Sequence, residues 1–311
     1  MKYNRLGDTS LVVSEIGFGC FAIGGHRSGN SYGPTDDHAS MAAIDVALDL
    51  GCTFFDTADV YGFGHSETLL GLALRRSGRS TGVVVATKVG GRFDGGVVRK
   101  DFSPQYISSA VEDSLRRLQR DVIDLYQLHD PPLECIERGE AFDCLDRLAA
   151  EGKIRAYGVS IHSAAEALRA VESGRPKALQ TTLNVISLVE PDDRPAVVLQ
   201  AVGEAGIGLI AREPLANGFL SGNYDVHTEF GEGDLRGHWP AARRAAYSAL
   251  ARSFIDSLRP GVSPVQAAIG FVLDQPQVST TIVGTKTPAQ ARINFTACDA
   301  PSFGEFMSSV A

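Results

Sequence analysis

The chain has 311 residues, of which 44% are apolar and 21% are charged, proportions typical of a soluble globular protein. The formal net charge of −8 argues against a dedicated surface for nucleic acid or anionic membranes, since both require clustered Lys and Arg. The five cysteines are scattered and contain no CxxC pair, which indicates neither a disulfide framework nor a zinc site and favours a reducing compartment. The sequence shows no secretory signal and no apolar run long enough for a membrane helix, so we expect a cytoplasmic location.

Short β-branched runs alternate with longer stretches of helical periodicity along the chain. Residues 3–6 and 11–14, joined by Gly7-Asp8, predict an opening β-hairpin. Eight strand-like runs follow, at residues 16–20, 52–55, 82–88, 122–128, 154–160, 178–182, 207–211 and 279–283. Helical periodicity is found at residues 37–50, 66–76, 103–118, 136–151, 164–172, 193–205, 264–273 and 288–295.

Eight strand–helix units in one chain of this length favour an α/β fold, a closed (β/α)8 TIM barrel that forms a single domain over residues 1–311. Strands that read as nearly continuous apolar runs, such as residues 82–88, suit a parallel sheet covered on both faces. An open doubly wound sheet has the same periodicity and stays the alternative.

Residues 213–240, after the seventh strand, are rich in Gly and Asn and too long for an ordinary connection. Their position on the C-terminal side of a strand favours a lid over a mere surface insertion. Residues 241–258 interleave basic and apolar side chains and predict an extra helix.

Polar residues follow three consecutive strands, where a parallel barrel carries its catalytic groups. Strand two ends at Asp56, with Tyr61 shortly after it, strand three ends at Lys88, and strand four ends at His129. Lys88 closes an apolar strand and needs a partner, for which Asp56 is the natural candidate. Such a pair would favour tyrosinate at Tyr61 and ease proton transfer, while His129 could hydrogen-bond a carbonyl oxygen. Singly, each residue has an ordinary structural interpretation; their coincidence predicts a site that protonates a forming alkoxide.

Five sequence blocks resemble the aldo-keto reductase family, in the family's order. FFDTADVYGFGHSETLLG (residues 54–71) is similar to the signature DTAxxYGxGxSExxLG, and TIVGTKTPAQARIN (residues 281–294) is similar to the cofactor signature. Three further blocks resemble the family's fourth, fifth and sixth strand segments: LYQLHDPP (residues 125–132), EGKIRAYGVS (residues 151–160) and LQTTLN (residues 179–184). The resemblance covers essentially the whole chain.

The resemblance implies that Asp56, Tyr61, Lys88 and His129 form a catalytic tetrad. Hydride would pass from a reduced nicotinamide to the substrate's carbonyl carbon, and Tyr61 would protonate the oxygen as general acid. His129 would orient the carbonyl, and no metal is needed.

The resemblance also implies a set of residues that bind NADP(H). These are Gly19, Ser160, Gln180, Arg212, Pro214, Leu215, Gly284, Thr285, Lys286, Gln290 and Asn294. Ser160 and Gln180 match residues that hold the nicotinamide carboxamide. Lys286, just before a helix with Pro288 near its start, supplies a cation and a helix N-terminus for the 2′-phosphate, which predicts NADP(H) over NAD(H). The alternative is an ordinary last helix with a solvated Lys286.

Two positions depart from the commonest family form. Ile161 stands where an Asn usually shares the carboxamide, and the following His162 is either a compensating group or an ordinary loop histidine. Arg212 replaces the tyrosine that stacks on the nicotinamide. Its guanidinium can stack on a ring, which would favour NADPH and reduction, or it can turn away and pair with a nearby carboxylate.

We therefore expect NADPH-dependent reduction of a small carbonyl substrate, with sugars or small aldehydes favoured over steroids. One alternative is an aldose dehydrogenase working in the oxidative direction, since the chemistry is reversible. The other is a cofactor-sensing subunit similar to the β subunits of potassium channels, which is disfavoured because no additional segment precedes the opening hairpin. No nucleic-acid or membrane partner and no particular oligomeric state is predicted.

Overall fold

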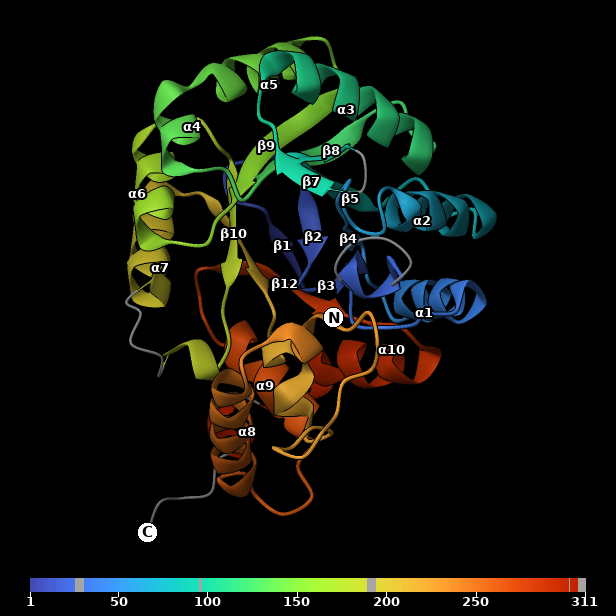
Figure 1. Ribbon diagram of the computed structural model, residues 1–311, viewed down its shortest axis with the longest axis vertical. Helices are drawn as coiled ribbons and strands as arrows, with labels where there is room; N and C mark the ends of the chain where they lie inside the picture. Colours follow the sequence, from blue (N-terminus) through green and yellow to red (C-terminus); the bar gives the residue numbers. More distant parts are fainter. Residues whose placement is uncertain (26–30, 95–96, 189–193, 302, 307–311) are drawn as a thin grey trace.

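The computed structural model describes residues 1–25, 31–94, 97–188, 194–301 and 303–306. In this part of the chain, eight parallel strands form a closed barrel in the order β10-β11-β12-β3-β4-β5-β8-β9, with helices around it (Figure 1). The strands are β3 (Ile16–Gly19), β4 (Phe54–Asp56), β5 (Val84–Val89), β8 (Ile123–His129), β9 (Ile154–Ser160), β10 (Ala178–Thr182), β11 (Gly208–Arg212) and β12 (Val278–Gly284). The predicted (β/α)8 TIM barrel is confirmed, and the open sheet is excluded.

The helices that follow the barrel strands bury their apolar faces against the sheet. They are α1 (Asp37–Asp49), α2 (His65–Arg76), α3 (Pro104–Leu118), α4 (Leu133–Arg138), α5 (Glu140–Ala150), α6 (Ala164–Glu172), α7 (Arg194–Ala205), α9 (Pro264–Leu273) and α10 (Pro288–Phe295). The prediction of a helix over residues 193–205 agrees with α7, except that its first residue lies outside the described residues.

The opening hairpin closes one end of the barrel. It consists of β1 (Tyr3–Arg5) and β2 (Val12–Ser14), paired antiparallel as predicted. Its side chains Leu6, Leu11 and Val13 are buried in one cluster with Phe54 and Leu125 of the barrel strands. Because this apolar cluster fills the N-terminal end, the cavity described below opens at the C-terminal ends of the strands.

The prediction of one helix over residues 136–151 is wrong. Over the described residues 133–150 the chain forms two helices, α4 and α5, which meet at Gly139. Gly139 has φ +76°, a left-handed conformation that ends the first helix and that other residues adopt only with strain. The apolar periodicity on both sides of this glycine concealed the break.

A second hairpin lies between the third predicted strand and the following helix, where the sequence predicts neither a strand nor a helix. β6 (Gly91–Asp94) pairs antiparallel with β7 (Val97–Lys100) after the barrel strand β5. It carries Lys100 to the barrel mouth, where Lys100 Nζ donates to the carbonyl oxygen of His129 at 2.7 Å.

The insertion after β11 folds over the mouth of the barrel. It contains the 3-10 turns Ala216–Ser221 and Leu235–His238 and leads into the predicted extra helix, α8 (Ala241–Asp256). Phe219 packs at the centre of an aromatic cluster in it and stacks on Trp239 with 5.9 Å between ring centroids. Ser31 and Tyr32, from the loop after β3, form bridges with Asp234 of the insertion.

The remaining short elements are the 3-10 turns Cys20–Ile23, Ile186–Leu188 and Ala297–Asp299 and the helix α11 (Phe303–Phe306). Within the described residues, no helix is both long and apolar enough to span a bilayer.

Candidate active site

Asp56, Tyr61 and Lys88 lie together at the C-terminal end of the barrel. Lys88 Nζ donates to Asp56 Oδ1 in a short contact, to the carbonyl oxygen of Thr57 at 3.0 Å, and to Tyr61 Oη at 3.3 Å. The ammonium has three protons, and these three acceptors use them all. Lys88 is 0% exposed and Asp56 is 1% exposed, so the charged pair is dry and held in one geometry.

Two glutamines complete the surroundings of the Asp56 carboxylate. Gln127 Nε2 and Gln180 Nε2 donate to Asp56 Oδ2 at 3.0 Å and 2.8 Å, and both glutamines are buried. Gln127 was missed by the sequence analysis, although it precedes His129 by two residues on one strand and therefore faces the same side. The two amides fix the carboxylate beneath Lys88.

Tyr61 and His129 pack against each other above this pair. Their rings meet edge to face with centroids 5.7 Å apart, and Phe21 packs on the other side of Tyr61. Burial raises the pKa of Tyr61, and the nearby Lys88 offsets only part of that rise. Lys88 lowers the pKa of the phenol through its charge and its hydrogen bond, as expected, but burial outweighs this effect and the net direction is upward.

The pKa of His129 lies well below its ordinary value. Burial is the main cause, and the positive charges of Lys88, Lys100 and Arg212 add to it. A neutral imidazole at this place can donate one hydrogen bond through a ring N–H without carrying a charge.

A close approach between two loops positions Tyr61. Gly62, with φ +61°, follows it in the loop between β4 and α2. A Cβ at Gly62 would lie 2.0 Å from the carbonyl oxygen of Gly24, so only glycine fits between the two backbones. The glycine of the YG pair thus fixes the direction in which Tyr61 enters the cavity.

A cavity of about 750 Å³ extends from this group to α10. Asp56, Tyr61 and His129 line it at one end, whereas Lys88 is buried behind them. Ten of the proposed cofactor residues also line it: Gly19, Ser160, Gln180, Arg212, Pro214, Leu215, Gly284, Lys286, Gln290 and Asn294. Thr285 is buried behind the wall, where its Oγ1 accepts a hydrogen bond from Asn294 Nδ2 at 2.9 Å.

Strand register explains how these distant residues come together. Gly19, at the end of β3, pairs with both Asp56 and Gly284 of the neighbouring strands. On the opposite side of the barrel, Ser160 pairs with His129 and with Gln180. The strand ends therefore form a continuous rim around the cavity floor.

The end of the cavity at α10 carries positive charge. Lys286 Nζ contacts the carbonyl oxygen of Tyr32, and Gln290 Oε1 accepts from the Lys286 backbone N–H at 2.8 Å. Arg236, from the insertion, lines the same part of the cavity and pairs with Asp234 at 2.6 Å. Arg236 was not anticipated, because only the folded insertion brings it there. Burial lowers the pKa of Lys286.

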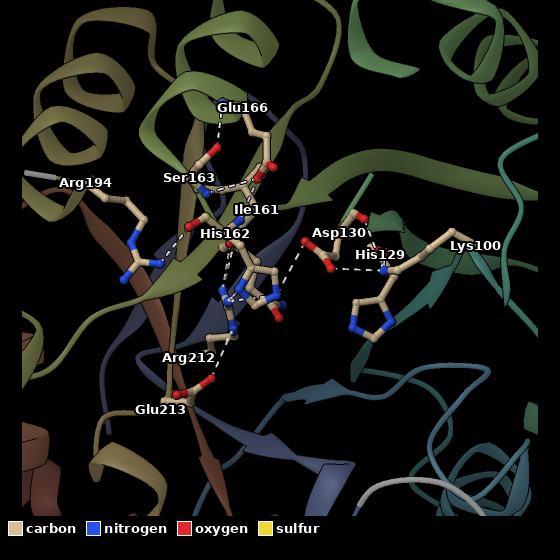
Figure 2. A network of polar contacts seen from close by, with 11 residues as sticks. Lys100, His129, Asp130, Ile161, His162, Ser163, Glu166, Arg194, Arg212 and Glu213 are labelled. Carbon is tan, nitrogen blue, oxygen red and sulfur yellow. Dashed lines mark hydrogen bonds and ion pairs between the residues drawn. The ribbon is translucent and has the colours of Figure 1, made fainter. Parts of the chain in front are cut away.

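Figure 2 shows a row of polar side chains at the cavity mouth, beside His129. We call Glu213, Arg212, His162, Asp130 and Lys100 the mouth row. Arg212 Nη2 donates to His162 Nδ1 at 2.9 Å, and its Nη1 donates to the carbonyl oxygen of Ile161 at 3.2 Å. The two departures from the family form thus contact each other. Among the described residues, no three His, Cys, Asp or Glu side chains gather in a way that could hold a metal ion.

Comparison with known proteins identifies the family. The model of the aldo/keto reductase family matches residues 15–310, nearly the whole chain. The chain belongs to the aldo-keto reductases, a family of oxidoreductases.

Individual relatives match over most of their length. The aldo-keto reductase YhdN of Bacillus subtilis is 35% identical over 297 residues, which are 93% of this chain and 86% of that protein. The aldo-keto reductase yakc of Schizosaccharomyces pombe, whose name includes NADP(+), is 32% identical over 91% of this chain and 83% of that protein. The structure of a glycerol dehydrogenase from Gluconobacter oxydans superposes with a TM-score of 0.80 at 30% identity, covering 96% of this chain and 90% of that chain.

Proposed function

We propose that this protein reduces an aldehyde or ketone to the alcohol with NADPH, using Tyr61 as the general acid. The observation that carries the proposal is the position of the Tyr61 phenol. It lies 3.3 Å from the buried Lys88 ammonium and lines an open cavity together with His129.

The four residues have distinct roles in this proposal. His129, kept neutral by burial and by nearby cations, donates a hydrogen bond that orients the substrate's carbonyl oxygen. Tyr61 gives its proton to that oxygen, and Lys88 stabilises the phenolate that is left. Asp56, held by two glutamines, keeps Lys88 charged, in agreement with the raised pKa of Lys88. The bound cofactor supplies the hydride to the carbonyl carbon.

The donor set along the cavity fits a dinucleotide with a 2′-phosphate. Lys286 offers a cation next to the N-terminus of α10, whose dipole favours an anion at the same end, and Arg236, paired with Asp234, lines that part of the cavity. The Ser160 and Gln180 side chains lie at the other end, where a carboxamide would be held. The name of the relative yakc, which includes NADP(+), supports the choice of NADP(H).

A polar, hydroxylated substrate fits the mouth row, and one relative is named a glycerol dehydrogenase. That name is also what favours the second candidate, oxidation of a polyol or aldose with NADP+, since the same residues can run the reaction in reverse. The scattered cysteines, all free, agree with a reducing cytoplasmic compartment.

Cofactor titration followed by turnover tests the proposal. Trp239, the single tryptophan, lines the cavity, so quenching of its fluorescence reports binding of NADPH or NADH. We expect tighter binding of NADPH, turnover of small aldehydes, and a loss of about 10²–10⁴-fold in kcat for Tyr61→Phe with unchanged NADPH affinity. Tyr3→Phe, on the opening hairpin, is the matched control.

Two results would overturn the proposal. Undiminished turnover in Tyr61→Phe would remove the general acid, and tight NADPH binding with no turnover on any carbonyl would favour the sensor alternative instead.

A further inference from the structure

The mouth row lies one layer outside the catalytic groups. His129 and Ser160 pair in register at the ends of β8 and β9, and the backbone N–H of Asp130 donates to the carbonyl oxygen of Ser160. Asp130 and His162 follow these two residues by one and two positions. The mouth row therefore borders the place where His129 and Tyr61 would hold a carbonyl, and it can contact a substituent next to that carbonyl.

The charges of the mouth row are balanced within it. Lys100 Nζ pairs with Asp130 Oδ2 at 3.1 Å, and Arg212 Nε lies 3.4 Å from Glu213 Oε1. Glu213 Oε2 also accepts from Asn217 Nδ2 at 2.8 Å. Two cations thus face two carboxylates, and burial together with the charge of Arg212 lowers the pKa of His162, so its ring is neutral. Both cations of the mouth row are therefore already paired, and an anionic ligand would have to compete with Asp130 or Glu213 for them.

His162 offers an accessible donor within the row. Arg212 Nη2 lies 2.9 Å from Nδ1 and 3.5 Å from Nε2, and a guanidinium can only donate, so this geometry favours the tautomer with the ring proton on Nε2. Nε2 lies 3.5 Å from Asp130 Oδ1, longer than an ordinary N–H···O hydrogen bond, and the side chain is 53% exposed and lines the cavity. The carboxylate of Glu213, also at the cavity wall, is an acceptor. A hydroxyl group, which both donates and accepts, matches such a neutral pair of partners.

We propose that His162 and its charge-balanced neighbours make this enzyme select neutral, hydroxylated aldehydes or ketones over both apolar and anionic ones. This inference rests on the proposed carbonyl reduction and names its substrate class. His162 is then the residue that contacts the hydroxyl next to the carbonyl, and Asp130 keeps Lys100 from attracting a carboxylate.

Two pairs of small aldehydes test the two parts of this proposal. Glyceraldehyde and propanal have the same three-carbon chain, but only glyceraldehyde carries hydroxyl groups. Glycolaldehyde carries a hydroxymethyl group next to its aldehyde, and glyoxylate carries a carboxylate there. Wild type should favour glyceraldehyde and glycolaldehyde in kcat/KM. Comparing ratios between variants cancels the different hydration of these aldehydes.

His162→Phe should lower the glyceraldehyde-to-propanal ratio of kcat/KM about 5- to 10-fold, the effect of one lost hydrogen bond. His38→Phe, an exposed histidine on α1, makes the same chemical change away from the cavity and should leave the ratio unchanged. An unaltered ratio in His162→Phe would overturn the role of His162.

Asp130→Asn tests the charge balance independently. Asp130 has φ +59°, a conformation that asparagine also tolerates, so the fold should be kept. Glyoxylate should gain about 5- to 10-fold relative to glycolaldehyde at low salt and lose that gain at high salt. Asp45→Asn, which frees Arg76 on the outer surface, is the control.

These measurements distinguish carbonyl reduction from the proposed substrate preference. No turnover of any of the four aldehydes by wild type would count against carbonyl reduction itself. Turnover with wild-type preference for propanal or glyoxylate, or with ratios that neither variant changes, would overturn only the specificity proposal.

Discussion

Two groups of ion pairs meet at the barrel mouth, and they differ mainly in their contact with water. The inner group, Lys88 and Asp56 with two glutamines, is dry and has every proton of the ammonium bonded. In the mouth row, Lys100 and His162 have about half of their side-chain surface exposed. In the functions proposed above, the inner group holds the proton donor in one geometry, and the outer group contacts the substrate.

The difference predicts unequal effects on stability. Lys88→Met leaves a buried carboxylate without its cation and should lower the free energy of unfolding by about 3–5 kcal/mol. Lys100→Met removes an exposed pair and should cost less than about 1 kcal/mol. Urea unfolding of the cofactor-free variants at pH 7.5 measures both, and equal losses would mean that burial does not distinguish the two groups.

A second buried aspartate, in the loop that follows Asp56, sharpens the contrast with it. Asp59 is buried at the wall of a second cavity, and its Oδ2 accepts from Tyr106 Oη at 3.4 Å, whereas Asp56 accepts from the Lys88 ammonium. Burial, reinforced by the charge of Glu67, raises the pKa of Asp59 to about 7. The folded protein therefore keeps this proton between about pH 4 and 7 while the unfolded chain loses it, so stability falls as pH rises through that window.

Asp59→Asn should remove this fall. The difference in free energy of unfolding between Asp59→Asn and wild type should increase in favour of the variant as pH rises from 5 to 8, by roughly 2–4 kcal/mol at pH 8. Urea unfolding at several pH values measures the difference. Asp45→Asn, at an exposed pair, should follow the wild-type profile, and a parallel profile for Asp59→Asn would contradict the expected protonation.

The inner group could be predicted from the sequence much better than the mouth row. Asp56, Lys88 and His129 end consecutive strands, and parallel strands bring such positions to one rim whatever lies between them. Gln127 obeys the same rule through strand alternation but carries no chemical signature of its own. The net rise in the pKa of Tyr61 depends on burial, which the sequence does not give.

The mouth row depends on contacts that no local pattern encodes. Arg212 and His162 are 50 positions apart, and Lys100 reaches its place on a hairpin that the glycines at residues 90–96 concealed. Tyr32 Oη meets Asn217 Oδ1 across 185 positions. The proposed specificity depends on loops joined in this way, so the catalytic chemistry is easier to predict from the sequence than the substrate.

The cofactor end of the cavity lies between these extremes. Lys286 is half-buried, and its Nζ contacts the Tyr32 carbonyl, a neutral acceptor that a phosphate can replace. Lys286→Ala should weaken NADPH binding about 10-fold, in line with one charge-assisted contact, and leave NADH binding nearly unchanged. Lys177→Ala, at a surface lysine beyond the opposite end of β10, controls for the loss of a positive charge. Fluorescence titration with NADPH and NADH measures both affinities, and the two nucleotides differ only in the 2′-phosphate. Equal losses of affinity for NADPH and NADH would mean that Lys286 supports the loop at Tyr32 and does not select the cofactor.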